Sequence, residues 1–137
     1  MFDEESRFEV YQEEDTGIGV IKYIGKLTPE VTAGVYKWMY ENIQRHGVDK
    51  IRGGIFDFRE VTSFHIANLH TIRRSSGNLN ADFDMSHIPT ALVVANPVQA
   101  TMVRTSLFVT SQDKRKKIVY SMEEGRAFID SYHQAKV

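Results

Sequence analysis

Apolar and polar residues alternate near the start of the chain and then change to helical spacing. Between Phe8 and Glu13 apolar and polar residues alternate, with the two-residue period of a half-buried strand. A second apolar stretch covers 18–24, and Asp15-Thr16-Gly17 between the two is typical of a turn. Two short strands joined by a turn predict an antiparallel hairpin.

Helical spacing is clearest over 29–46. Val31 and Val35 recur along one face of this segment. Thr28 suits the N-cap because its hydroxyl can accept a hydrogen bond from the first turn, and Gly47 suits the position just past the end. The pattern therefore predicts a long helix that packs one face on the core.

Ile51–Asp57 is the stretch around which the other segments are expected to pack. Ile55 and Phe56 follow two glycines, which indicates a buried strand that ends at Asp57. A polar loop should come next, followed by a helix over about 66–76.

The second half of the chain continues to alternate strands and helices. Because parallel strands need crossover connections, the order β-β-α-β-α-β-α-β-α predicts an α/β fold. We expect about five strands in a mostly parallel sheet, with an N-terminal β-hairpin and four helices. The remaining elements are a strand over 90–95, a helix from Asn96-Pro97 to about Val109, a strand over 117–120 and a last helix that begins with the capping box Ser121-Met122-Glu123-Glu124.

Composition narrows the class of protein. The 137 residues, 42% of them hydrophobic, are enough for one domain with its own core, so 1–137 is predicted to be a single domain with residues 1–7 loose. The net charge is −1, whereas nucleic-acid-binding domains usually carry an excess of basic residues, so this class is disfavoured. The chain has no cysteine, which excludes thiolate metal sites and thiol nucleophiles. With no signal-peptide pattern and no long apolar run, we expect a cytoplasmic protein without a transmembrane segment.

Three segments resemble the STAS domain family, and within it the SpoIIAA-like proteins related to anti-sigma-factor antagonists. GVIKYIGKLTPE is similar to the second strand and first helix of that family, and IFDFREVTSF is similar to its central strand and loop. ALVVANPVQATMVRTSLF and KIVYSMEEGRAFI resemble the closing β-α-β-α. The resemblance covers about 8–134 and implies a non-catalytic regulatory module that forms homodimers or binds protein partners.

One departure from the family pattern concerns phosphorylation. Phosphorylated members carry Asp-Ser-Ser-Gly just after the central strand, whereas the alignment places His65-Ile66-Ala67-Asn68 there. The resemblance therefore implies constitutive binding without the usual phosphoacceptor serine. A signalling antagonist phosphorylated on Ser63 or Thr62 is an alternative, to be dropped if a cognate kinase leaves the intact mass unchanged.

Polar residues follow the predicted strands and begin the predicted helices. Because the carboxyl ends of parallel strands share one edge, these residues are expected to meet there. Helix N-termini at that edge would attract an anion. We therefore expect a site for a protein partner or a small anionic or lipid ligand, with no cofactor and no metal. Its candidate residues are Lys26, Thr28, Asp57, Arg59, Thr62, Ser63, His65, Asn96 and Gln99.

Catalysis is the alternative interpretation of part of this set. Asp57, Ser63 and His65 could serve a small hydrolase or transferase as base, nucleophile and orienting group. The sequence lacks a G-x-S-x-G elbow, so this interpretation requires the three side chains to converge in a pocket. His65 and His70 are five apart, which does not suit a metal pair on one helical face.

Two further features have a structural and a functional interpretation. We interpret the basic run over 114–117 as charges that protect a strand edge from aggregation. The alternative is a contact with an acidic partner, a phosphate or an anionic lipid. The helices over 29–46 and from Asn96-Pro97 carry apolar residues around much of their circumference, and a leftover patch would mark a dimer interface or a lipid-facing groove. The pattern over 78–88 is compatible with a helix and with a loop.

Overall fold

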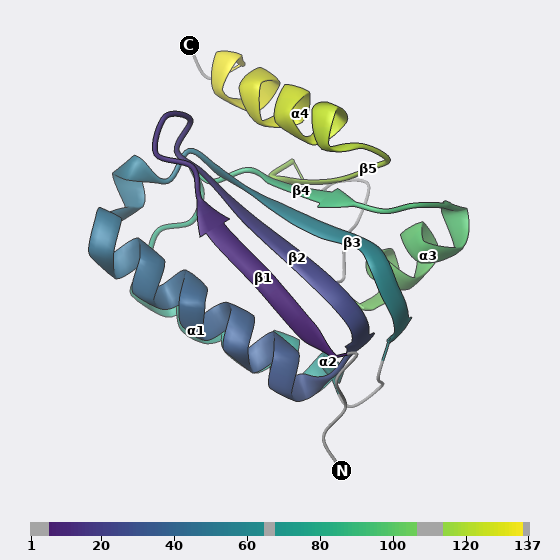
Figure 1. Ribbon diagram of the computed structural model, residues 1–137. Helices are drawn as coiled ribbons and strands as arrows, with labels where there is room; N and C mark the ends of the chain where they lie inside the picture. The colour runs from purple at the N-terminus through teal and green to yellow at the C-terminus, as the bar shows by residue number, and fades with distance from the viewer. Residues whose placement is uncertain (1–5, 65–67, 107–113, 136–137) are drawn as a thin grey trace.

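The computed structural model describes residues 6–64, 68–106 and 114–135. These residues form five strands, four α-helices and one short 3₁₀ helix, arranged as in Figure 1. In chain order the elements are β1 (Arg7–Gln12), β2 (Ile18–Leu27), α1 (Pro29–His46), η1 (Val48–Lys50), β3 (Gly53–Phe64), α2 (Asn68–Asp82), β4 (Thr90–Val93), α3 (Pro97–Ser106), β5 (Lys116–Val119) and α4 (Met122–Gln134).

The five strands form one mixed sheet in the order β1-β2-β3-β4-β5. β1 runs antiparallel to β2, with Arg7 opposite Ile24, and the remaining neighbours are parallel. Gly17 in the hairpin turn has a φ of 74°, a left-handed conformation that glycine adopts without steric cost. The predicted α/β class, the mostly parallel sheet, the hairpin and the four helices are confirmed.

Local capping signals locate the helix ends well. The Thr28 hydroxyl accepts a hydrogen bond of 3.3 Å from the backbone N–H of Val31, and Gly47 ends α1 with a φ of 84°. The Ser121 side chain accepts from the Glu124 N–H at 3.1 Å, as predicted for the start of α4. The Glu124 carboxylate differs from the expected box, because it accepts from the N–H one residue before Ser121.

Several predicted boundaries are wrong, including the end of β2, which continues past 24 to Leu27. β3 does not end at Asp57 but continues to Phe64, because it remains paired with β2 along its whole length. α2 passes through Gly77 and ends at Asp82, and packing against α1 supports this extension. β4 ends at Val93 instead of at 95. The last residues of the helix predicted to about Val109 lie outside the described residues.

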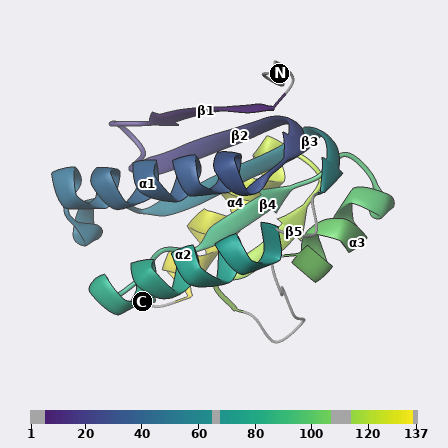
Figure 2. The same cartoon turned by 90° about the horizontal axis from the view of Figure 1, so that it is seen from below.

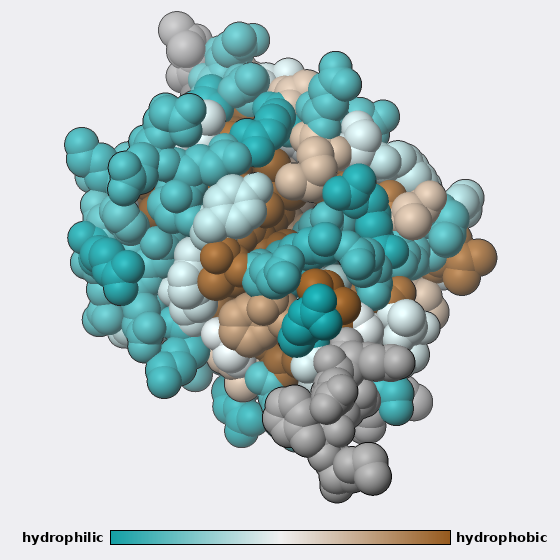
Figure 3. All heavy atoms as spheres, viewed as in Figure 1, coloured by the Kyte–Doolittle hydropathy of each residue, from teal (hydrophilic) through white to brown (hydrophobic). Residues whose placement is uncertain are grey.

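The helices cover the two faces of the sheet unequally. α1, α2 and α3 lie on one face and α4 lies on the other, as a view from below shows (Figure 2). Seen as in Figure 1, the surface shows apolar side chains at its centre, over the β1–β2 hairpin, surrounded by hydrophilic ones (Figure 3). The edge of the sheet that β1 forms is therefore less covered by helices than the two faces of the sheet.

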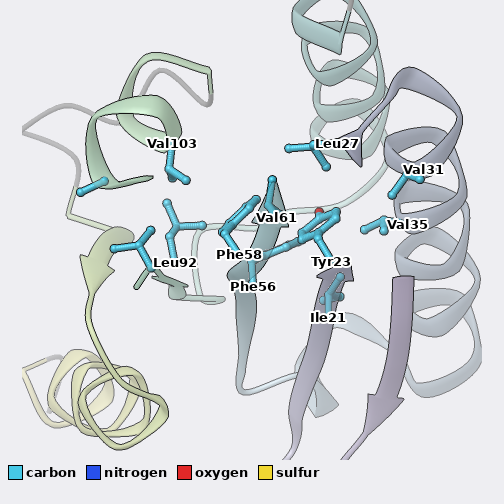
Figure 4. Packing of buried hydrophobic residues seen from close by; sticks show 12 residues of the cluster. Ile21, Tyr23, Leu27, Val31, Val35, Phe56, Phe58, Val61, Leu92 and Val103 are labelled. Atoms are coloured by element: carbon cyan, nitrogen blue, oxygen red, sulfur yellow. The ribbon is translucent and has the colours of Figure 1, made fainter. Parts of the chain in front are cut away.

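Each face of the sheet has its own core. Under α1 and α3, the ring of Tyr23 stacks on that of Phe58 with centroids 4.8 Å apart, and Phe56 lies beside them (Figure 4). On the other face Ile129 of α4 is fully buried against the sheet. A Cβ at Gly53 would lie 2.9 Å from two Ile129 carbons, so the close approach of α4 depends on this glycine.

Candidate ligand-binding site

The predicted strand-end site is not assembled as a single cluster. Asp57 pairs with Val93, the last residue of β4, whereas β2 and β3 continue together well beyond that point. At about 3.3 Å per residue, this extension separates Asp57 from Ser63 by about 20 Å. Thr28 follows the end of β2, so it also lies far from Asp57. The register of two long strands thus divides the predicted site.

Several of the predicted site residues have structural roles. Asn96 caps α3, because its side chain accepts from the Gln99 N–H at 2.9 Å. The Gln99 amide donates to the backbone carbonyls of Arg59, at 3.4 Å, and Val61, at 3.1 Å. These bonds fix the start of α3 to the middle of β3. Thr28 is likewise occupied as the cap of α1.

The end of β3 brings together a smaller group of predicted residues. Lys26 of β2 lies opposite Ser63, and both are exposed. Thr62 is the extra residue in a register shift between Gly25 and Lys26, and its side chain is also exposed. His65 lies outside the described residues. The geometry therefore offers an exposed polar strand end there.

Asp57 and Arg59 form a pair on one side of β3. The Asp57 carboxylate, whose side chain is only 5% exposed, accepts from Nε and Nη2 of Arg59, each at 2.9 Å, and from the Arg59 backbone N–H at 3.0 Å. Burial alone would raise the pKa of Asp57, but the hydrogen bonds and charge of Arg59 outweigh it, and the pKa lies below its usual value. Asp57 is therefore held as a charged, structural carboxylate.

This pairing argues against the hydrolase interpretation. A carboxylate with a lowered pKa and three hydrogen bonds is a weak general base. Ser63, the candidate nucleophile, lies about 20 Å farther along the same strand. Asp57 and Ser63 therefore do not converge, which is the geometry that the catalytic interpretation requires.

Arg59→Ala is expected to destabilise the fold by about 2 kcal/mol at pH 7, because it removes two charge-assisted hydrogen bonds from a buried carboxylate. In the parent protein, the lowered pKa of Asp57 contributes stability above pH 3.8, its unfolded value, and this contribution is lost as the pH falls through the folded value. In Arg59→Ala, burial raises the pKa of Asp57 above its unfolded value, so the variant instead loses stability as the pH rises above 3.8. The difference between the two proteins should therefore increase from pH 3 to pH 7 in urea unfolding.

A double variant provides the control for this experiment. Asp57→Asn combined with Arg59→Ala removes the titrating group from the variant, so its stability relative to the parent should change only through the parent's own Asp57, near and below pH 3.8. Above that pH this difference should level off, whereas the loss of stability in Arg59→Ala should continue to grow as the unpaired carboxylate ionises. A loss of stability in Arg59→Ala that stays constant between pH 3 and pH 7 would contradict the assigned pairing.

The structure contains a cavity that the sequence did not predict. It has a volume of about 390 Å³ and lies between the sheet and the helices α1 and α2. α2 packs mainly against α1 rather than against the strands, which leaves space beneath it. The volume falls within the range of small-molecule sites in proteins, about 300–1,000 Å³.

Small residues on the sheet account for the hollow. Gly19 of β2 pairs with Gly54 of β3, which pairs with Thr90 of β4, so a row across three strands carries little side-chain volume. A Cβ at Gly54 would meet only one atom within 4 Å, at 3.6 Å from the Phe56 ring. On the opposite wall, a Cβ at Gly77 of α2 would meet nothing within 4 Å. The open space at Gly54 therefore contributes to the cavity, whereas Gly77 lines it from an exposed position on α2.

Most of the remaining lining is apolar and aromatic. Trp38, the single tryptophan of the chain, lines the cavity from α1. Exposed lining residues on α2, such as Asn80, place an opening along that helix. The other apolar lining residues are Ile21, Tyr23, Leu27, Met39, Ile43, Ile51, Phe56, Phe58, Ile72, Leu79, Met85, Ile88 and Leu92.

Two tyrosines that line the cavity have raised pKa values. Burial raises the pKa of Tyr23 well above its usual range, and the nearby Tyr36 hydroxyl adds to the shift. Burial also raises the pKa of Tyr36, partly offset by a hydrogen bond with Ser76 and by the charge of Arg115. Both phenols stay neutral at physiological pH, so the cavity carries no negative charge from them.

Sequence reasoning missed this site for an identifiable reason. The sequence shows two glycines ahead of Ile55, but it does not show which face of the sheet each of them lies on. Gly53 faces Ile129 of α4, whereas Gly54 faces the cavity. Within the basic run, Arg115 and Lys116 line the cavity, and Lys116 and Lys117 belong to β5, an edge strand of the sheet.

Two further features concern the binding of metal ions and the crossing of a membrane. Within 6–64, 68–106 and 114–135, no group of three or more histidine, aspartate and glutamate residues is placed to hold a metal ion. None of the helices in the described part of the chain has the length and apolar character required to cross a bilayer.

Comparisons with known proteins identify the fold. Neither a scan of protein-family models nor a search of curated proteins gives a match to this sequence. Among solved structures, an uncharacterized protein of the DUF3478 family from Shewanella loihica, with a SpoIIAA-like fold, superposes with a TM-score of 0.63 at 13% identity. The alignment covers 94% of this chain and 98% of that one.

Two anti-sigma-factor antagonists are also similar. The antagonist from Mycobacterium paratuberculosis gives a TM-score of 0.58 at 14% identity, over 95% of this chain and 99% of that one. Unphosphorylated SpoIIAA gives 0.56 at 12% identity, over 94% and 97%. These likenesses show that the chain has the SpoIIAA-like α/β fold, as its resemblance to STAS domains implied.

Proposed function

We propose that this SpoIIAA-like domain is a non-catalytic binding module that holds one small, largely apolar ligand between its sheet and helices α1 and α2. The observation that carries the proposal is the 390 Å³ cavity with its aromatic and aliphatic lining. Concave, mostly apolar sites with a few polar groups are the usual form of small-molecule sites in proteins.

Burial of apolar surface favours an occupant. The cavity opens along α2, so water can enter it, and an apolar ligand that displaces this water would bury the aromatic and aliphatic lining. Such a ligand adds its binding free energy to the stability of the fold.

A regulatory role through a protein partner is the second candidate function. It is favoured by the anti-sigma-factor antagonists among the proteins with the same fold. Val98 is 74% exposed and Met102 is 40% exposed, one turn apart on α3, and they offer apolar contact area for such a partner. The homodimer, the cytoplasmic location and binding without the usual phosphoacceptor serine stay predictions.

The ligand-binding proposal is tested with a neutral apolar fluorophore, N-phenyl-1-naphthylamine. Trp38 lines the cavity, so a fluorophore inside it should receive energy from this single tryptophan. We expect saturable energy transfer with one fluorophore bound per chain. Transfer that does not saturate, or none at concentrations that saturate known apolar carriers, would contradict the proposal.

A further inference from the structure

We infer that the ligand is a single-chain amphipathic acid, with its apolar tail against the sheet and its anionic head at the basic end of the cavity. The inference rests on the proposed function, and it adds the chemical class of the ligand. It is carried by the uneven distribution of charge along the cavity lining.

Three basic residues line the cavity: Arg73 of α2, Arg115 just before β5, and Lys116 at the start of β5. No aspartate or glutamate lines it among the residues that the structure describes. Side chains of one charge around an otherwise apolar cavity complement a ligand of the opposite charge. The favoured ligand therefore carries an anionic group.

Arg115 and Lys116 both lie beside Thr90 of β4. Nη1 of Arg115 donates to the backbone carbonyl of Ile88 at 3.0 Å and approaches the Thr90 hydroxyl at 3.4 Å. Lys116 pairs with Thr90 across the sheet, so these two basic residues meet around one position of β4. Both of the Arg115 bonds use one nitrogen of a guanidinium group that carries five N–H donors.

The helical wall completes this basic end. The charge of Arg115 acts on the Tyr36 hydroxyl of α1, which is hydrogen bonded to Ser76 of α2. Arg73 lies one turn before Ser76 on the same helix and also lines the cavity. Arg115 and the Tyr36 and Ser76 hydroxyl groups thus lie near one another, with Lys116 beside Thr90 and Arg73 about one turn before Ser76. A carboxylate at this end could accept charge-assisted hydrogen bonds.

The neighbouring part of the cavity wall on the sheet suits a hydrocarbon tail. Ile21, Phe56 and Leu92 form a continuous row of apolar side chains across β2, β3 and β4, next to the row that contains Gly54. The sheet therefore provides a flat apolar wall beside the hollow. A tail along this wall and a head at Arg115 would place each part of an amphiphile against matching chemistry.

The strand β5 offers a matched pair of variants. Lys116 lines the cavity, whereas Lys117 is exposed and pairs with Ala91, whose side chain belongs to the core under α4. Lys116→Gln and Lys117→Gln therefore change the net charge equally, in adjacent positions, on opposite faces of the sheet. Arg115→Gln is a second test at the basic end. If Arg115→Gln folds poorly because it loses the Arg115 hydrogen bonds, Lys116→Gln still tests the basic end, since it leaves those bonds in place.

The experiment measures competition of dodecanoate, dodecanol and acetate with N-phenyl-1-naphthylamine. In the parent protein we expect dodecanoate to bind about tenfold more tightly than dodecanol, and acetate not to compete. Lys116→Gln and Arg115→Gln should each weaken dodecanoate by about threefold to tenfold and leave dodecanol unchanged, while Lys117→Gln leaves both unchanged.

The outcomes separate this inference from the proposed function. Equal binding of dodecanoate and dodecanol would overturn the anionic head but leave a ligand-binding module. Equal losses of dodecanoate affinity in Lys116→Gln and Lys117→Gln would assign the effect to overall charge and overturn the basic end as its cause. No binding of the fluorophore or of either long-chain compound would overturn both proposals.

Discussion

Gly54→Leu is expected to weaken ligand binding by about tenfold to a hundredfold while leaving the fold intact. The new side chain projects from the sheet into the cavity, where a Cβ at this position meets only the Phe56 ring at an ordinary contact distance. A ligand that shares the space must then be compressed or displaced, and overpacking costs about 1–3 kcal/mol. The measurement is the affinity for N-phenyl-1-naphthylamine, with energy transfer from Trp38 as the signal.

Stability provides the control for this variant. Because the leucine fills empty apolar space, the midpoint of urea unfolding should stay the same or rise, so that weaker binding is not a result of unfolding. Gly54→Ala, which fills less of the cavity, should show an intermediate affinity. Unchanged affinity in a folded Gly54→Leu protein would show that the fluorophore binds elsewhere.

Gly53→Ala is expected to lower the free energy of unfolding by about 1–3 kcal/mol, although it lies next to a position that tolerates the same change. Its Cβ would approach three carbons of Ile129 within 3.0 Å. Ile129 is fully buried in the core under α4, so it has little room to move. The strain should therefore fall on the contact between α4 and the sheet.

Gly54→Ala is the matched control, because it makes the same change on the cavity face of the same strand. It should stabilise the protein by about 0.4–1 kcal/mol, since alanine reduces the freedom of the unfolded chain and meets no clash. Urea unfolding of both variants measures the contrast. Equal stabilities would show that the two glycines do not face opposite cores.

Local signals in the sequence were sufficient for most of the fold. The alternation over 8–13, the Thr28 and Ser121 caps and the order of strands and helices act within a few residues, and the structure confirms them. The length of β3 was not predictable in this way. Residues 59–63 are mostly polar and exposed, and they are held in the sheet by pairing with β2, a partner distant in the sequence.

The candidate site illustrates the same limit. The predicted edge assumed that all parallel strands end at one level, but β4 ends opposite Asp57 while β2 and β3 continue. The open space depends on Gly54, which the sheet register places between Gly19 and Thr90. Missing volume between distant residues has no local pattern, so it was found only in the assembled structure.

Native mass spectrometry of the purified protein, before and after denaturation, tests the central claim most directly. The account predicts a bound species with the mass of a single-chain amphipathic acid, released on denaturation and depleted in Gly54→Leu. If the protein carries no such species, and dodecanoate added in excess forms no one-to-one complex, the cavity is not a ligand site and the central claim is wrong.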